Sequence, residues 1–275
     1  MKTNDMLDTN QLTLSKRVFE QFKSLMFKES GVTLGDEKQV MVKARLAKRL
    51  RQLQLNSFEQ YLQRVKSPDH RQEIQHLIDA LTTNETSFFR EAQHFEFLNH
   101  QLASFSVTVP IRIWSAACST GEEAYSLAMT VAENRCHPDW QILASDINTQ
   151  VLASAGLGIY DITRASSIPR RYLIKYCLKG VRSQAGQLLF SERLKQHIRF
   201  VLLNLDGELP EIGRFQFIFL RNVLIYFNEI KRKQIINKII SKLVPGGYLF
   251  IGHSESLRGI TDLLRPVQAT IYQKC

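Results

Sequence analysis

The stretch Ile111–Met129, IRIWSAACSTGEEAYSLAM, decides the fold of this chain of 275 residues. Its first apolar residues predict a buried strand, the small residues from Ser115 to Gly121 predict a tight loop, and the apolar residues after Gly121 recur at helical spacing. A strand that passes through such a loop into a helix is typical of the first crossover of a doubly wound α/β sheet, where ligands bind at the carboxyl end of the strand. The alternative is an ordinary strand–turn–helix in which an acidic residue caps the helix.

The rest of the chain predicts two domains of different class. Residues 14–81 contain four short amphipathic helical segments, which predict a small all-α domain. Farther along, strands alternate with helices, which predicts an α/β domain with a mostly parallel sheet. The expected strands lie near 111–115, 140–145, 199–203, 215–220, 247–252 and 269–273, the last two as an antiparallel edge pair, and the expected helices span 122–134, 148–156 and 229–243. The expected boundaries are a helical domain at 1–83, a linker at 84–105 and the α/β domain at 106–275, with a small β unit inserted at about 157–198.

Composition limits the function less than the motifs do. With 44% hydrophobic and 23% charged residues the chain is globular in type, and its net charge of +10 favours an anionic partner. Nucleic acid, an acidic protein surface and an anionic membrane face all fit that charge. The four cysteines form no C-x-x-C pair, so neither a disulfide framework nor a metal site is predicted. The start of the chain, MKTNDMLDTNQLTLSKR, lacks the apolar core of a signal peptide, and the cytoplasm is the expected location.

The first loop and the end of the second strand together predict a nucleoside site. Asp146 ends the apolar run WQILAS, where a carboxylate can accept hydrogen bonds from both ribose hydroxyls, although it could equally cap the following helix. A dinucleotide site requires G-x-G-x-x-G, whereas this loop is A-A-C-S-T-G followed by Glu122 and Glu123. Two carboxylates would repel a pyrophosphate but suit a ligand that carries a sulfonium. S-adenosylmethionine is therefore favoured over NAD.

Polar residues at other strand ends are expected to face the same crevice. Asn204-Leu205 follows RFVLL and Arg221-Asn222 follows FQFIFL, although each pair could also be an ordinary turn. The segment TTNETSFFR, which ends at Arg90, either forms a hinge between the domains or contributes to the site. Arg90 favours the second interpretation, because a guanidinium beside a cationic cofactor is useful only if it binds a carboxylate.

At this point several motifs resemble those of the chemotaxis receptor methyltransferases, the CheR family. The motifs are LTTNETSFFRE, IWSAACSTGEEAYS, ASDIN, FLRNVLIYF and GGYLFIGHSES, and the resemblance extends over essentially the whole chain. It implies a Rossmann-like methyltransferase sheet, S-adenosylmethionine as methyl donor, S-adenosylhomocysteine as product, and chemoreceptor glutamates as methyl acceptors. The cofactor-contacting positions that it implies are Asn84, Thr86, Arg90, Glu123, Asp146, Asn204, Leu205, Arg221 and Asn222.

The resemblance also implies roles for a tyrosine and for the insertion. Tyr226 matches the tyrosine that is placed, with Arg90, near the transferred methyl group. The insertion corresponds to a β-subdomain that docks a receptor C-terminal pentapeptide in some members. Members that use this tether carry a G-x-G loop where this chain has Gly180-Val181-Arg182-Ser183, which leaves tether binding open.

The chemistry that follows needs no general base. A glutamate carboxylate has a pKa near 4.3 and is already a nucleophile at neutral pH. No histidine–acid pair stands out in the motifs, and His253 in GHSES is expected to be structural. Positioning and exclusion of water can contribute up to ~7–11 kcal/mol, and we expect Arg90 and Tyr226 to orient the reactants.

A basic helix is the candidate docking surface for the substrate. Residues 36–53 predict a helix with six cations, and no acid lies between Lys38 and Arg51. A solvated helix face is the alternative, and nucleic acid would also fit the charge, but no aromatic side chains are interleaved to stack bases. The residues expected to dock glutamate-rich receptor helices are Lys43, Arg45, Lys48 and Arg49. An RNA methyltransferase and a non-catalytic cofactor-binding module remain the alternative functions.

Overall fold

A computed structural model describes residues 12–103, 110–134 and 139–275. Cys136, most of the N-terminal stretch used to predict the location, and the expected domain start at residue 106 lie outside these ranges. The chain divides into two compact units, the first made of 1–83 with 226–228 and the second of 84–225 with 229–275. Among the described residues, no helix combines the length and the apolar character that crossing a bilayer requires.

The first unit is the expected helical bundle. Its helices are α1 (Lys16–Ser30), α2 (Gln39–Gln52), α3 (Phe58–Lys66) and α4 (Arg71–Leu81), with single 3-10 turns before α2 and α4. Ser15 and Ser57 accept hydrogen bonds from the first turns of α1 and α3, and Gly31 ends α1 at φ 74°. Tyr61 and Phe22 pack together in the buried core of this bundle.

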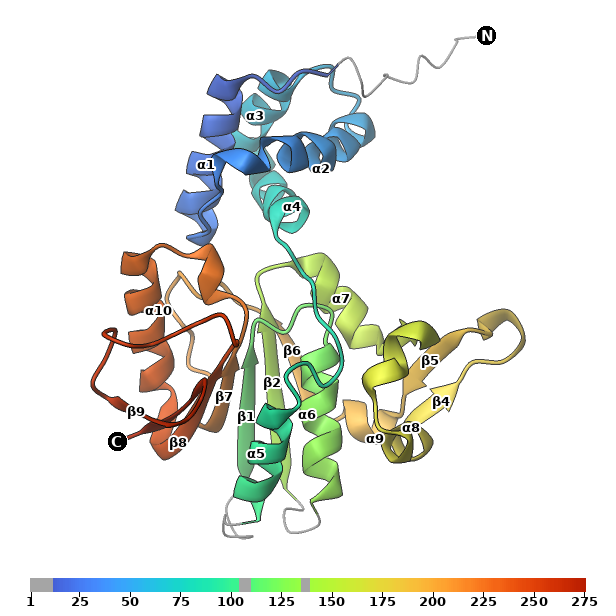
Figure 1. The fold of residues 1–275 in the computed structure, drawn as a ribbon. Helices are drawn as coiled ribbons and strands as arrows, with labels where there is room; N and C mark the ends of the chain where they lie inside the picture. The colour runs from blue at the N-terminus through green and yellow to red at the C-terminus, as the bar shows by residue number, and fades with distance from the viewer. Residues whose placement is uncertain (1–11, 104–109, 135–138) are drawn as a thin grey trace. The chain divides into compact units, whose positions relative to one another are not determined.

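The second unit is built on a seven-stranded sheet with the order β6-β2-β1-β7-β8-β10-β9. The strands are β1 (Ile111–Ala116), β2 (Trp140–Asp146), β6 (Ile198–Leu202), β7 (Phe215–Leu220), β8 (Leu243–Ile251), β9 (Leu264–Gln268) and β10 (Ile271–Lys274). The first five in this spatial order are parallel, and β10 is antiparallel to both β8 and β9. Its helices are α5 (Gln93–Leu102), α6 (Glu122–Glu133), α7 (Thr149–Leu157) and α10 (Glu229–Ser241), and in Figure 1 α5 and α6 lie in front of β1 and β2.

Three expectations about this unit were wrong. Residues 84–102 are not a linker, because α5 and the preceding segment place Phe88, Phe95 and Leu98 in the core of the second unit. The antiparallel pair of β8 and β10 is confirmed, but β9 forms the edge. The sequence Pro245-Gly246-Gly247, expected as a turn before the strand, lies within β8 at a register irregularity.

The insertion forms a separate three-stranded antiparallel sheet of order β3-β5-β4. Its elements are β3 (Ile159–Asp161), a 3-10 helix (Ile162–Ser167), α8 (Arg170–Tyr176), β4 (Cys177–Lys179), β5 (Gln187–Phe190) and α9 (Glu192–Lys195). Its buried aromatic residues join the core of the second unit, where Phe190 stacks on Tyr125 of α6 at 4.2 Å between ring centroids. The inserted sheet is therefore packed against the main domain.

Candidate functional site

The loop between β1 and α6 is fixed by close contacts that only glycine permits. Gly121 has φ 95°, and a Cβ there would lie 2.8 Å from Ala155 Cβ and 2.9 Å from Tyr160 Oη. Ser119 also has a positive φ of 50°. The single glycine of the loop therefore lets the chain turn into α6 beneath a neighbouring tyrosine.

Asp146 lies at the end of β2, where the sequence places a ribose-binding carboxylate. It is buried, and its two carboxylate oxygens accept hydrogen bonds from the backbone N–H groups of Ser119 at 2.9 Å and Asn148 at 3.0 Å. The alternative interpretation, that Asp146 caps the next helix, is wrong. Asn148 is the cap residue of α7, since its side chain accepts hydrogen bonds from Gln150 and Val151. Asp146 instead ties the first loop to the end of the second strand.

Both glutamates at the start of α6 are paired with arginine. Glu122 is fully buried, pairs with Arg164 and accepts a hydrogen bond from Thr120 Oγ1 at 2.6 Å. Glu123 accepts a hydrogen bond from Ser115 Oγ at 2.6 Å and pairs with Arg221 at 2.8 Å. Burial raises the pKa of both carboxyls, against the opposing effect of their partners. Both carboxylates, which the sequence predicts to suit a cationic ligand, thus already have a cationic partner in the protein, and the predicted contact of Glu123 with the cofactor stays a prediction.

Arg221, at the end of β7, is the centre of a buried ionic network. Its guanidinium contacts Glu91 at 2.9 Å, Glu123 at 2.8 Å and the carbonyl oxygen of Arg90 at 2.5 Å. Burial alone would raise the pKa of Glu91, but the nearby Arg221 holds it below its usual value. The side chain of Arg221 thus binds other groups of the protein, and its predicted contact with the cofactor stays a prediction.

Glu91 also lies beside two histidines, a grouping that did not stand out in the sequence motifs. Its carboxylate lies 3.5 Å from His94 Nδ1 and 3.8 Å from His253 Nε2, and these donor atoms lie within 4.8 Å of one another. Burial and the charge of Arg221 lower the pKa of His94 to about 4. Because Arg221 already supplies the cation at this carboxylate, we assign no metal to the cluster.

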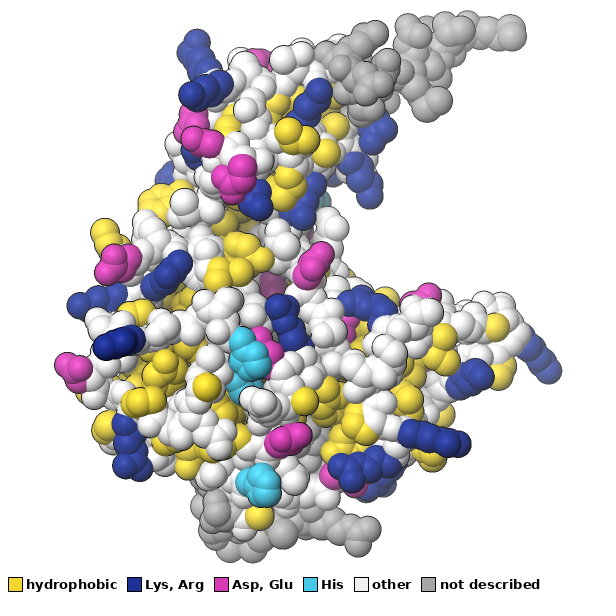
Figure 2. All heavy atoms as spheres, in the orientation of Figure 1, with side chains coloured by type: hydrophobic (Ala, Val, Ile, Leu, Met, Phe, Trp, Pro, Cys, Tyr) yellow, Lys and Arg dark blue, Asp and Glu magenta, His cyan; other side chains and the backbone are white. Residues whose placement is uncertain are grey.

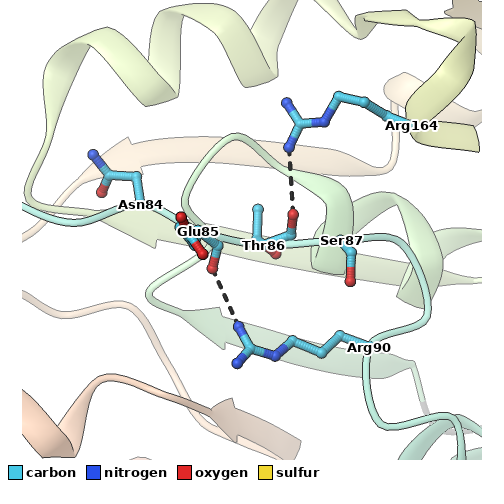
Figure 3. Close-up of a pocket in the computed structure, with 6 residues that line it drawn as sticks. All are labelled: Asn84, Glu85, Thr86, Ser87, Arg90 and Arg164. Carbon is cyan, nitrogen blue, oxygen red and sulfur yellow. Dashed lines mark hydrogen bonds between the residues drawn. The ribbon is translucent and has the colours of Figure 1, made fainter.

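The segment from Asn84 to Arg90 lines a cavity of about 490 Å³ together with Arg164. This volume lies in the range of small-molecule sites. Figure 3 shows Arg164 and Arg90 on opposite sides of the segment, donating to the carbonyl oxygens of Thr86 at 3.4 Å and Glu85 at 3.2 Å. The main chain is fixed further by Phe89 N–H, which donates to Ser126 Oγ, and by Ser119 Oγ, which donates to Asn84 O. Asn84, Thr86 and Arg90 thus line one cavity, and their predicted contact with the cofactor stays a prediction.

The polar residues that follow the remaining strands are held by separate sets of hydrogen bonds. Asn204 forms a local turn by accepting a hydrogen bond from Asp206 N–H, and Leu205 is buried. Asn222 has φ 56°, and its N–H donates to the buried Glu255, which also accepts from Leu224 and Gly252. Asn204 and Asn222 therefore both occupy turns, and their predicted contacts with a cofactor remain predictions.

Lys238 of α10 supports the turn that carries Asn204 and Leu205. Its ammonium donates to the carbonyl oxygens of Leu205, Asp206 and Gly207 at 2.5, 2.9 and 2.8 Å. We expect Lys238→Met to lower the free energy of unfolding by about 1–3 kcal/mol, because these acceptors lose their donor. Urea titration checks this, and Lys233→Met, an exposed position on the same helix, is the control. Equal midpoints for the two variants would contradict the assigned support.

Two further predicted groups are placed by the structure. Tyr226 is half-buried and ends a 3-10 turn (Leu224–Tyr226), and residues 226–228 cluster with the helical unit. In the loop that departs from G-x-G, Arg182 has φ 54°, and a Cβ on Gly180 would lie 1.9 Å from Gln184 O. Arg182 thus adopts a left-handed conformation that glycine would adopt without strain.

Arg45 and Arg49, which were predicted to dock the substrate, form their hydrogen bonds and ion pairs within the helical unit. Arg45 donates to the carbonyl oxygens of Leu81 and Thr82 at the end of α4. Arg49 forms a two-point ion pair with the buried Glu73 at 2.7 and 2.9 Å. Lys43 is half-buried and Lys48 is exposed. The basic helix therefore has an inward pair of arginines with a structural role, and its outward lysines remain candidates for docking.

Several residues of the site were not found from the sequence. Glu91 and Glu255 lie within the quoted motifs, next to Arg90 and within GHSES, so their position in these motifs was the available signal. Arg164 and Tyr160 come from the insertion, where no local pattern distinguishes them from surface residues. Their partners lie 78 and 40 residues away in the chain.

Comparison with known proteins covers both units. Residues 17–82 match the family described as CheR methyltransferase, all-alpha domain, and residues 84–273 match CheR methyltransferase, SAM binding domain. A chemotaxis protein methyltransferase of Escherichia coli K12 is 39% identical over 90% of this chain and 87% of its own length. Two further proteins with that name are similar. The one from Salmonella typhimurium is 37% identical over 96% of this chain and 92% of its own length, and the one from Borreliella burgdorferi is 35% identical over 100% of both chains.

Proposed function

The chain belongs to the CheR methyltransferase family, and from this premise we propose that it methylates glutamate side chains of chemoreceptors. It is an S-adenosylmethionine-dependent methyltransferase, because the matched domain is the cofactor-binding domain of the family. The observation that carries the proposal is the match of both units, in order and over nearly the whole chain, to the two domains of this one family. The relatives named above are chemotaxis methyltransferases, which supports receptors as the substrate.

The residues at the sheet edge fit the cofactor. Asp146 offers a fixed, buried carboxylate for hydroxyl groups, and Asn84 and Thr86 line a cavity of suitable size. When bound, the cofactor would supply a methyl group on a sulfonium. The ionised glutamate carboxylate of the substrate would form a bond to that methyl carbon without a general base, and S-adenosylhomocysteine would be the leaving group. We infer that Arg90, exposed at this cavity, binds the substrate carboxylate, and that Tyr226 acts with it in positioning the reactants.

The decisive experiment uses labelled methyl donor with either receptor cytoplasmic fragments or RNA. We expect label on the receptor that is released by mild base, as a methyl ester requires. Label on RNA would support the alternative methyltransferase, and cofactor binding without transfer to either would support a non-catalytic module. The substrate proposed here also places the enzyme in the cytoplasm. Nucleic acid and the membrane itself are not proposed as partners.

Receptor helices rich in glutamate would be attracted to the outward lysines of α2. Figure 2 shows Lys and Arg side chains on the surface of the helical unit, and α2 carries no acidic residue. We expect Lys43→Glu with Lys48→Glu to weaken receptor methylation about fivefold to tenfold through KM, since opposite charges guide docking. Kinetics with varied receptor concentration measure this.

The control for docking is Lys28→Glu, an exposed charge reversal on α1. Cofactor affinity is expected to stay unchanged in all these variants. Equal KM values for the α2 variant and the α1 control would contradict docking at α2. Arg45 and Arg49 are unsuitable for this test, because their replacement would disturb α4 and Glu73. Receptor-tail binding is left out of the proposal, because a long cationic side chain stands at position 182.

A further inference from the structure

One short part of the insertion contacts both loops that form the cofactor site. Tyr160 Oη donates to the carbonyl oxygen of Thr120, in the loop after β1, at 2.6 Å. Ser167 Oγ donates to the carbonyl oxygen of Phe88, in the segment that lines the cavity, at 2.8 Å. Arg164, between them in the chain, reaches both places, because it donates to Thr86 O and pairs with Glu122. Residues 160–167 thus link two loops that are separated by about 30 residues in the chain.

The tyrosine is held firmly enough to fix the position of the first loop. Only 4% of Tyr160 is exposed, and its ring packs edge-on against Phe88 at 5.0 Å and Tyr125 at 5.8 Å. The hydroxyl passes so close to Gly121 that a Cβ there would lie 2.9 Å from it. Because this hydroxyl is buried and cannot move aside, it fixes the position of the Thr120 carbonyl oxygen to which it donates. The turn into α6 therefore depends on a residue of the insertion.

We propose that Tyr160, Arg164 and Ser167 are positioning residues that hold residues 84–90 and 117–121 in the geometry that binds S-adenosylmethionine. The inserted subdomain is thus a structural part of the cofactor site in addition to any role in receptor recognition. This inference rests on the cofactor assignment to these loops. Its physical basis is pre-organisation, because loops held in one geometry before binding lose less freedom when the cofactor binds.

The insertion provides a matched control at the opposite end of α6. Tyr176 is also a buried tyrosine of the insertion, and its hydroxyl donates to Glu133 at 2.7 Å. Glu133 is the last residue of α6, whereas Thr120 lies two residues before the first. Tyr160→Phe and Tyr176→Phe therefore remove one hydroxyl each from the same kind of side chain. Only the first contact lies at a loop of the cofactor site.

The experiment compares these two variants by calorimetric titration with S-adenosylhomocysteine, with melting temperatures measured in parallel. We expect Tyr160→Phe to weaken binding by about fivefold to thirtyfold and Tyr176→Phe to leave it within about twofold. Ser167→Ala is expected to weaken binding as well. Hydrogen exchange should accelerate at residues 117–121 in Tyr160→Phe and at residues 84–90 in Ser167→Ala. A general loss of stability would instead affect the two tyrosine variants alike.

Two results are separated by this design. If wild-type protein binds S-adenosylhomocysteine and Tyr160→Phe and Ser167→Ala bind it as tightly as Tyr176→Phe does, the positioning role is overturned. If wild-type protein does not bind it, the cofactor assignment itself fails. Weaker binding in Tyr160→Phe and Ser167→Ala, with faster exchange in the loop that each side chain contacts, supports the proposal.

Discussion

Replacing Arg221 by methionine is expected to lower the free energy of unfolding by about 3–5 kcal/mol, which is the largest loss of stability that we expect from any substitution in the site. The substitution keeps much of the apolar stem but leaves Glu91 and Glu123 without their shared cation in a buried environment. It also removes the donor to the carbonyl oxygen of Arg90. Urea unfolding followed by circular dichroism measures the change.

The loss should depend on pH in a defined direction. Without Arg221, burial is expected to raise the pKa of both carboxyls above the values in the unfolded chain. A carboxyl with a raised folded-state pKa binds its proton more tightly in the folded state, so its ionisation destabilises the fold as pH rises. The difference between variant and wild type should therefore be larger at pH 8 than at pH 5.

Lys242→Met is the control for this experiment. Lys242 pairs with the exposed Glu211, and an exposed pair contributes about 0–1 kcal/mol. A loss in Arg221→Met no larger than in this control, or one independent of pH, would contradict the central role assigned to Arg221.

The sheet could be predicted from the sequence because its strands are apolar runs and its helices are periodic. Phe215–Leu220 is buried at every position, which is how a central parallel strand differs from a surface one. β9 was missed because its sequence LRPVQ contains proline and is mostly exposed, as an edge strand allows. α5 was missed because the capping residues before it indicated a hinge, although Phe95 and Leu98 enter the core.

The site was predicted in part, because residue types at strand ends are visible in a sequence but their partners are not. Position and charge alone led to Asp146 and Arg90 as candidates for the site, and their roles there stay predictions. The partners of Arg221 lie 130 and 98 residues away, and no local spacing indicates them. The same limit applies to Arg45 and Arg49, whose spacing correctly places them on one helix face but cannot show that this face is turned toward α4.

Arg90→Ala is expected to reduce turnover of the receptor by roughly 100-fold or more, because misplaced reactants lose the advantage of positioning. Arg90 is exposed and its side chain donates to Glu85 O, so its replacement should leave the fold intact. Single-turnover methylation at saturating cofactor measures the chemical step. Affinity for S-adenosylhomocysteine is measured separately, since Arg90 is also predicted to contact the cofactor.

Two further variants show what the guanidinium does. Arg90→Lys keeps the charge but cannot grip a carboxylate at two points, so its turnover should fall between those of wild type and Arg90→Ala. Tyr226→Phe should lower turnover with little change in cofactor affinity, if the hydroxyl acts on the reacting groups and not on binding. Near-normal turnover in both Arg90→Ala and Tyr226→Phe would remove both residues from the reaction. A defect in Arg90→Ala that disappears at saturating cofactor would make Arg90 a binding residue for the methyl donor. The loss of an interaction made only in the transition state would instead lower turnover even when the cofactor is saturating.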